Sequence, residues 1–170
     1  MEKKYGIVYE PGKWNDNSRI RRSHNCYAYA MNDFNPDRNR FPQPGIKSNM
    51  GRPNKQDFVC PIITERALND VKTRRVKSNG ECPIGYRKVM LFVDPYTDYH
   101  FYREDDDEDE NGNKLWSHKP GSTNATNKDD SGNLITDPRT ADRNIEKTGY
   151  NYTDHCLTYC VPIKIINLKP

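Results

Sequence analysis

The sequence predicts an α+β fold, in which a small antiparallel sheet packs on an N-terminal helix that bears a cysteine and on a second helix. Three observations predict it: helix-favouring runs in the first half, β-rich segments separated by turn residues in the second half, and long polar loops between them. The chain has 170 residues, of which 33% are hydrophobic, so we expect one domain with a modest core. We assign 1–22 as an N-terminal arm and 23–170 as the domain.

The first helix is expected over 25–33. Asn25 or Ser23 can cap its start with a side-chain oxygen, and the alanines that follow favour the helical backbone. Ahead of this helix, the apolar run 5–9 predicts an edge strand or an arm laid on a neighbouring chain.

A long loop and then a second helix follow. Residues 35–55 are rich in Pro, Asn, Arg and Gly, which favours a loop, and a loop of this length is more often a binding or covering segment than a passive connector. The second helix is predicted to begin near Pro61, a favourable first helical position, and to run to about Val76. Its apolar face would consist of Ile63, Ala67, Leu68 and Val71.

The strands are expected in the second half. Residues 86–94 predict the clearest strand, because β-branched and aromatic residues dominate it and an Asp-Pro pair stops it. The chain is expected to return over 97–103, turn at an Asn-Gly-Asn segment and add a third antiparallel strand over 114–118. A last strand is expected over 157–168, where Pro162 would place it at an edge or end it early.

Charge is unevenly distributed although the net charge is only +3. The first 90 residues are basic, whereas 104–110 consists entirely of Asp and Glu, which predicts an acidic insertion that forms a solvated loop. The polar stretch 121–144 predicts a second long surface loop. The basic half contains aromatic residues but no recognisable nucleic-acid-binding module, so we do not expect nucleic acid as a partner.

Cys26 is the first candidate for chemistry. It opens the predicted helix directly after the basic segment 19–22, and a thiol near arginines and near the unpaired N–H groups of a helix start has a lowered pKa. Such a thiol is a candidate nucleophile, although free cysteines are also commonly buried as small apolar residues.

Two downstream histidines are candidates for its base. His100 lies in a predicted strand, where Asp98 and Tyr102 share its face, and a histidine beside an aspartate can serve as a general base or as a structural residue. His118 would orient His100 if the neighbouring strand placed it on the same face. The candidate catalytic set is therefore Cys26, His100, His118 and Asp98.

Five cysteines leave at least one free thiol. The other four are Cys60, Cys82, Cys156 and Cys160. They allow a structural zinc site, although only the last two have suitable spacing, or a Cys60–Cys82 or Cys82–Cys156 disulfide in an oxidising medium. We expect no bound metal or cofactor. No apolar leader follows Met1 and no run is long enough to span a bilayer, so we expect synthesis in the cytoplasm, a reducing compartment.

Four motifs together carry a resemblance to an uncharacterised group of bacterial and large-DNA-virus proteins. They are Asn25–Ala30 (NCYAYA), Asp98–Arg103 (DYHFYR), Trp116–Gly121 (WSHKPG) and Ile135–Arg139 (ITDPR). The order of cysteine helix, histidine strand and polar third strand is similar to that of NlpC/P60-like and papain-like thiol hydrolases. This resemblance implies such a fold, with Cys26 as nucleophile, His100 as base and His118 as the polar third member.

Two functions are compatible with these features. The first is a thiol-hydrolase-like domain, a Cys-His amide or peptide hydrolase that acts by acyl transfer. The alternative is a non-enzymatic minor capsid or cement protein of a large DNA virus particle. Its partners would be other virion or assembly proteins, contacted through the loops 35–55 and 121–144 and the termini.

Overall fold

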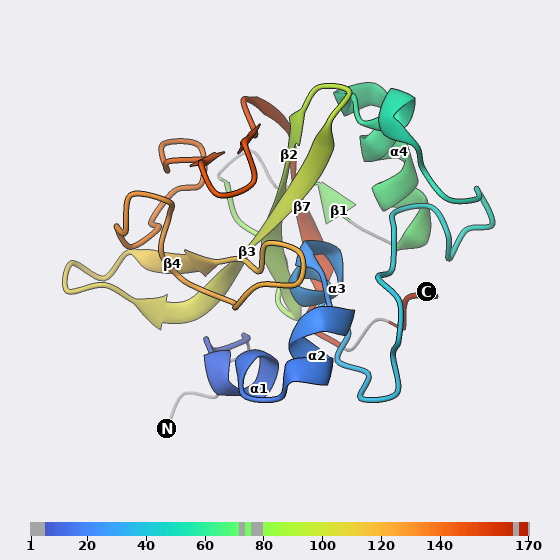
Figure 1. The fold of residues 1–170 in the computed structure, drawn as a ribbon. Coiled ribbons are helices and arrows are strands. Elements are labelled where there is room, and N and C mark those ends of the chain that lie inside the picture. The colour runs from blue at the N-terminus through green and yellow to red at the C-terminus, as the bar shows by residue number, and fades with distance from the viewer. Residues whose placement is uncertain (1–5, 72–73, 76–79, 165–166, 170) are drawn as a thin grey trace.

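The fold is α+β and is built on a five-stranded sheet in which every pairing is antiparallel (Figure 1). This computed structural model describes residues 6–71, 74–75, 80–164 and 167–169. The strand order is β1-β7-β2-β3-β4, with β1 at Arg74–Arg75, β2 at Tyr86–Asp94, β3 at Asp98–Glu108, β4 at Lys114–Ser117 and β7 at Asp154–Pro162. A separate two-stranded sheet joins β5 (Asn144–Ile145) to β6 (Tyr150–Asn151). The predicted small antiparallel sheet is confirmed.

Short helices surround this sheet. They are α1 (Pro11–Asn15), α2 (Ser18–Ser23), α3 (Cys26–Ala30), the 3₁₀ helix η1 (Lys55–Asp57) and α4 (Cys60–Asp70). Helices α3 and α4 contact β3 and β7 respectively, while α1 and α2 lie below the sheet in Figure 1. Helix α3 is shorter than the helix predicted over 25–33. Helix α4 ends at Asp70, before the predicted end at Val76, which lies outside the described residues.

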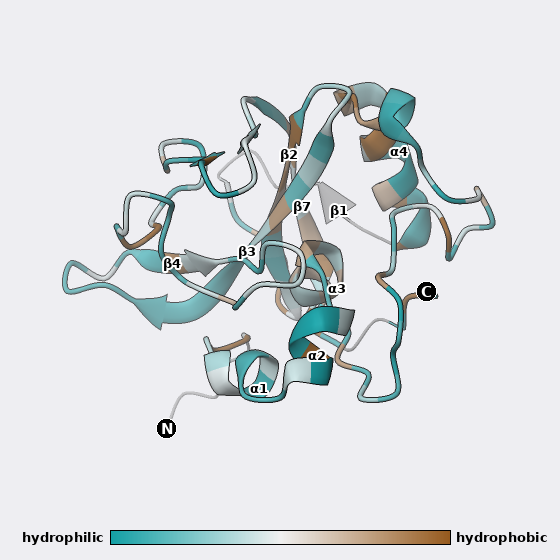
Figure 2. Cartoon of the chain, in the orientation of Figure 1, coloured by the Kyte–Doolittle hydropathy of each residue, from teal (hydrophilic) through white to brown (hydrophobic). Residues whose placement is uncertain are grey.

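The central strand β2 contributes buried residues to both faces of the sheet, since successive side chains of a strand point to opposite faces. Val89, Leu91 and Val93 pack with Tyr27 and Ile63 of the two helices. The intervening residues face the other side and join a second cluster, composed of Met90, Phe92, Tyr102, Trp116, Ile135, Ile145 and Tyr152. Figure 2 shows the hydrophobic residues concentrated on the strands and on α4, with the surrounding loops mostly hydrophilic. A third, smaller cluster consists of Trp14, Tyr29 and Ala125, so the described residues of a chain with few apolar residues divide their core into three parts.

The acidic run is part of the sheet, so the expected solvated loop over 104–110 is wrong for the residues up to Glu108. β3 continues through Glu108, and Asp105 is buried between Arg103 and Ser117. The Arg103 Nε donates to Asp105 Oδ1 at 2.9 Å, and the Ser117 hydroxyl donates to Oδ2. A carboxylate that finds both partners inside the fold can be buried despite its charge.

The last strand lies inside the sheet and not at its edge. β7 pairs with β2 on one side and with β1 on the other. Pro162 ends the strand, which was the second outcome expected of a proline there.

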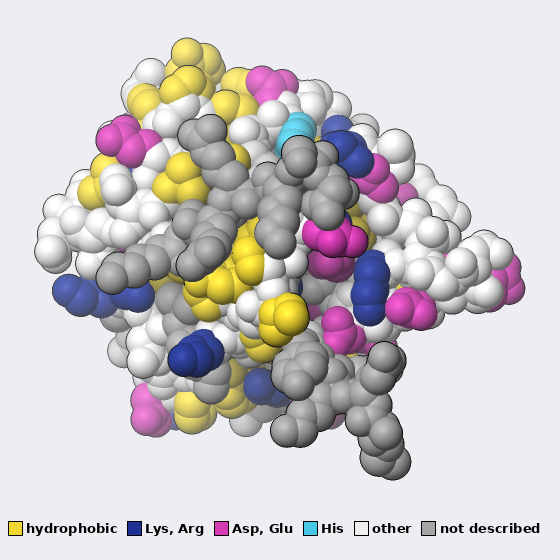
Figure 3. Space-filling model, turned by 180° about the vertical axis from the view of Figure 1, so that it is seen from behind, with side chains coloured by type: hydrophobic (Ala, Val, Ile, Leu, Met, Phe, Trp, Pro, Cys, Tyr) yellow, Lys and Arg dark blue, Asp and Glu magenta, His cyan; other side chains and the backbone are white. Residues whose placement is uncertain are grey.

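In Figure 3, which shows the molecule from behind, acidic and basic side chains lie next to one another along one side of the surface.

The N-terminal segment is held against its own chain. The Asp106 N–H donates to the Ile7 carbonyl, and the Tyr9 N–H donates to the Asp107 carboxylate. Trp14 of α1 is buried against Tyr29 of α3, with ring centroids 5.0 Å apart. The described part of the run 5–9 therefore lies beside the end of β3 without forming a strand.

The loop 35–55 is anchored on α4. The Asp70 carboxylate accepts hydrogen bonds from the hydroxyl of Tyr27, the N–H of Gly45 and both the N–H and the hydroxyl of Ser48. Arg66, one turn earlier, donates to the carbonyls of Pro44, Met50 and Gly51. These contacts give the loop a defined path without secondary structure of its own.

Candidate functional site

The candidate site lies at one end of β3, where no strand of the described residues pairs with its outer edge. β4 pairs with β3 only from Arg103 onward, so the edge of β3 near Asp98 and His100 is open. A cavity of about 150 Å³ occupies this position, and Cys26, Asp98 and His100 all line it. The structure thus brings three of the four predicted residues to one cavity.

Cys26 approaches the cavity from the helical side of the sheet. It is the first residue of α3, whose start is capped by the Asn25 side chain accepting from the Ala28 N–H at 3.0 Å. The same Asn25 amide donates to the Pro42 carbonyl at 2.8 Å. Cys26 is the free cysteine of the described residues and is only 5% exposed, so it joins the core around α3.

The thiol is not activated. Burial, with a smaller contribution from the negative charge of Asp98, raises the pKa of Cys26 to about 12. We had expected a lowered pKa from the helix start and the nearby arginines; that prediction is wrong. The loss of water around the sulfur outweighs whatever a helix of five residues contributes.

His100 reaches the cavity from the opposite face of the sheet, and His118 lies beside it. The His100 Nε2 is 2.7 Å from the His118 Nδ1, and the His118 Nε2 is 2.9 Å from the Lys128 carbonyl oxygen. A carbonyl only accepts, so the His118 Nε2 carries the hydrogen and its Nδ1 accepts from His100. The predicted orienting contact between the two histidines is therefore present.

Both imidazoles are held neutral. Burial lowers the pKa of His118 to about 4, and burial together with the neighbouring His118 lowers the pKa of His100 well below its ordinary value. The tautomers set by the Lys128 carbonyl leave the His100 Nδ1 as an acceptor. No hydrogen bond links this imidazole to the Cys26 thiol among the described residues.

Asp98 does not orient His100. Its carboxylate accepts a 2.7 Å hydrogen bond from the hydroxyl of Tyr152, and burial raises its pKa. The Tyr152 ring stacks on His100 with centroids 5.0 Å apart. Tyr152 lies in a polar stretch with no periodicity, so nothing in the local sequence indicates its place in this site.

Lys119 is a buried residue that sequence reasoning missed. Its ammonium group donates to the carbonyls of Arg21, His24 and Gly121. These three acceptors satisfy all the donors of a lysine, and burial lowers its pKa to about 7. Lys119 thereby fixes the junction of α2 and α3 to the loop after β4, next to the candidate site.

The other four cysteines form two disulfides. Cys60 of α4 is joined to Cys156 of β7, and Cys82 is joined to Cys160 of the same strand. Both expected pairings, Cys60–Cys82 and Cys82–Cys156, are wrong, and the sulfurs are not available as zinc ligands. Among the described residues no group of three or more His, Cys, Asp or Glu side chains is arranged to hold a metal ion, and no described helix is long and apolar enough to span a membrane.

The comparisons with known proteins identify one curated relative. The chain is 42% identical to insoluble matrix shell protein 1 of Ruditapes philippinarum over 136 residues, which cover 79% of this chain and 80% of that protein. No family model and no solved structure matches. A shell protein relative over this length contradicts the expected hydrolase function and supports the structural alternative. It does not support the expected place in a virus particle.

Proposed function

This chain belongs to the family of insoluble matrix shell protein 1, and we propose from that premise that it is a structural protein of an insoluble extracellular matrix. It would act through its surface contacts with other matrix proteins and not through turnover of a substrate. The single observation that supports this most strongly, beside the relationship itself, is the pair of disulfides.

The disulfides favour an extracellular location. Disulfides persist in oxidising environments and are rare where thiols are kept reduced. Cys60–Cys156 joins α4 to β7. Cys82–Cys160 joins the segment before β2 to β7 as well. Two covalent links on one strand compensate for a modest core, which suits a protein that must persist outside the cell. The two disulfides thus argue against the reducing compartment expected from the sequence.

The state of the candidate site supports a structural role. The Cys26 thiol is buried and protonated, and the histidines are neutral and hydrogen-bonded to one another. A reactive cysteine needs exposure and a lowered pKa, whereas these groups have the properties of a satisfied core. We also propose that the arrangement of α3, the histidine strand and His118 is a thiol-hydrolase-like layout that now serves as a scaffold.

Assembly with other matrix proteins would use the surface loops. The 121–144 loop presents Leu134, which is 48% exposed, and its turn at Asp129–Asn133 is held by hydrogen bonds to the Asp129 carboxylate and carbonyl. The 35–55 loop is fixed to α4 by Asp70 and Arg66. Loops held in one conformation lose little entropy on binding a partner.

Fractionation of the source tissue tests this proposal. Antibodies against the chain and peptide mass spectrometry are expected to place it in the extracellular matrix, in the fraction that resists extraction by salt and detergent. Recovery of the protein mainly from the soluble interior of cells would overturn the proposal. In an activity screen of the purified chain against amide and ester substrates, we expect no turnover that depends on Cys26. The wild-type chain and Cys26→Ala should therefore give the same result.

A further inference from the structure

A basic pocket lies on α2, away from the cavity at Cys26. Its volume is about 360 Å³, and it is lined by Ser18, Arg19, Arg22, Ser23, Arg38 and Asn39. Three of these six residues are arginines, and no carboxylate is among them. The lining thus combines guanidinium, hydroxyl and amide groups, all of which can donate hydrogen bonds to an anion.

Two of the arginines are not neutralised. Arg19 and Arg22 are three residues apart on α2, so they lie on one face of this helix. Both are exposed, and in the described part of the chain neither forms an ion pair. Arg22 donates only through Nε, to the Ser18 carbonyl at 3.3 Å, which leaves its two terminal nitrogens available.

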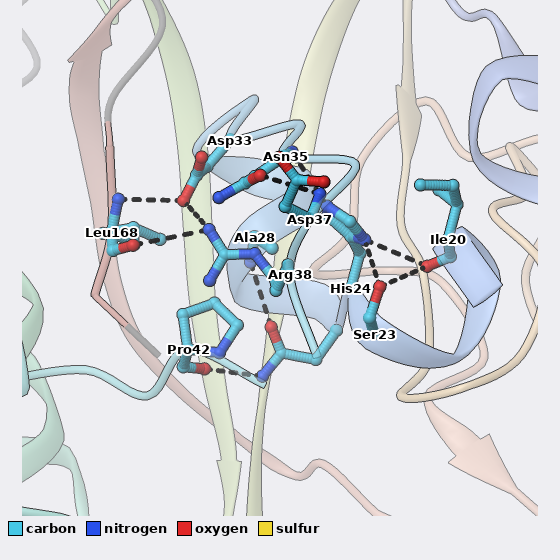
Figure 4. A network of polar contacts seen from close by, with 11 residues as sticks. Ile20, Ser23, His24, Ala28, Asp33, Asn35, Asp37, Arg38, Pro42 and Leu168 are labelled. Atoms are coloured by element: carbon cyan, nitrogen blue, oxygen red, sulfur yellow. Dashed lines mark hydrogen bonds and ion pairs between the residues drawn. The ribbon is translucent and has the colours of Figure 1, made fainter. Parts of the chain in front are cut away.

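The third arginine is buried and ion-paired. The Arg38 side chain is 2% exposed, and its Nη2 donates to the Asp33 carboxylate and to the Leu168 carbonyl (Figure 4). Its Nε and Nη1 are buried without a hydrogen-bond partner among the described residues. Because these nitrogens are buried and Asp33 neutralises the guanidinium, Arg38 contributes to the wall of the pocket, and Arg19 and Arg22 supply its free positive charge.

The pocket does not depend on the start of the helix. The Asn17 side chain already accepts from the N–H groups of Arg19 and Ile20, so the backbone donors of this turn are occupied. Ser23 and His24 are likewise occupied, since both interact with the Ile20 carbonyl. The groups that remain for a ligand are the side chains of Arg19 and Arg22, the Ser18 hydroxyl and the Asn39 amide.

We propose that this pocket binds a phosphate group, either as the free ion or on a phosphorylated side chain of a partner protein. A guanidinium matches two oxygens of a phosphate with parallel hydrogen bonds. A phosphate monoester carries close to two negative charges and three acceptor oxygens, so it can engage Arg19 and Arg22 together, whereas a carboxylate carries one charge. This binding activity goes beyond the structural role proposed above and does not depend on it.

Titration of the full chain, followed by ¹H–¹⁵N correlation NMR, tests the proposal. Inorganic phosphate and N-acetyl-phosphoserine amide are expected to produce saturable shifts centred on the amides of 18–23 and 38–39, and tighter binding of one of them identifies the source. N-acetyl-aspartate amide is expected to bind about tenfold or more weakly. Absence of saturable shifts, or aspartate binding equal to phosphate, would overturn the proposal.

Paired variants separate the pocket from general charge attraction. Arg19→Gln with Arg22→Gln is expected to weaken phosphate binding by about tenfold or more, because charge-assisted hydrogen bonds are lost. Arg52→Gln with Lys55→Gln removes the same charge from exposed positions outside the pocket and is expected to leave binding unchanged. Equal weakening by both pairs would contradict a defined site. If the first pair does not fold, the wild-type shift map decides.

Discussion

The Nε2 of His100 lies 2.7 Å from the Nδ1 of His118, and both residues are buried. The Nε2 of His118 in turn donates a hydrogen bond to the Lys128 carbonyl. These two contacts fix the ring of His100, whereas the Cys26 thiol is protonated and largely buried. The contact that would orient His100 is therefore present, but among the described residues no hydrogen bond joins this imidazole to the Cys26 thiol, and that thiol is not activated.

Acid is expected to destabilise the fold through these histidines. The pKa of His118 is lowered from 6.5 to about 4 by burial, and the pKa of His100 is lowered as well. The unfolded chain then binds more protons within this window, so the free energy of unfolding falls as the pH drops from about 6.5 toward 4. Urea unfolding across this range measures the slope.

His118→Gln should flatten that slope in part, because it removes one of three buried histidines; burial lowers the pKa of the third, His24, to about 4 as well. His155→Gln is the comparison variant: His155 is exposed and interacts with the Thr158 hydroxyl, and although partial burial lowers its pKa too, its loss should reduce the slope less than the loss of His118. A slope that His155→Gln reduces as much as His118→Gln does would show that the buried pair is not responsible.

Cys26 is expected to react slowly with alkylating reagents in the folded protein. Its pKa is raised from 9.0 to about 12, so at neutral pH the thiolate fraction is about a thousandfold below that of an unshifted thiol. Iodoacetamide labelling, followed by mass spectrometry with and without urea, measures the difference. Equal rates in the folded and unfolded states would contradict the description of this site.

The buried carboxylate of Asp105 is expected to be essential for stability. Asp105→Ala would leave the Arg103 guanidinium buried without its charge partner, which costs about 3–5 kcal/mol. Glu110→Ala changes a residue of the same acidic run that is exposed, and surface changes of this kind stay within about 0.5 kcal/mol. Denaturant unfolding of both variants compares them; similar small effects would show that the run is a solvated loop after all.

Each disulfide should stabilise the fold substantially. The bonds close long segments, with sequence separations of 96 and 78 residues, and loss of a native disulfide typically costs about 2–5 kcal/mol. Cys60→Ser with Cys156→Ser, and separately Cys82→Ser with Cys160→Ser, should lower the free energy of unfolding by this amount. Reduction of the wild-type chain should lower it further than either variant pair.

The local features of the sheet could be predicted from the sequence. The β-branched and aromatic residues of 86–94 and the turn before 114 lie within short windows, so β2, β3 and β4 follow from the residues themselves. The contact between His100 and His118 could be stated only as a condition, because it depends on how two strands are aligned. Nothing local specifies that alignment.

The long-range features could not be predicted. Cysteine connectivity does not follow from spacing, and the central place of β7 depends on two partners distant in sequence. The burial of Asp105 goes against its run of charged neighbours and depends on Arg103 and Ser117. The raised pKa of Cys26 has the same origin, since only the packed structure shows that the sulfur lost its water.

Peptide mapping of the native protein without reduction tests the central claim most directly. A structural protein of an extracellular matrix should yield the linked pairs Cys60–Cys156 and Cys82–Cys160, with Cys26 recovered as the thiol. All five cysteines recovered as free thiols, from protein taken directly out of its tissue under acid quenching, would contradict the account.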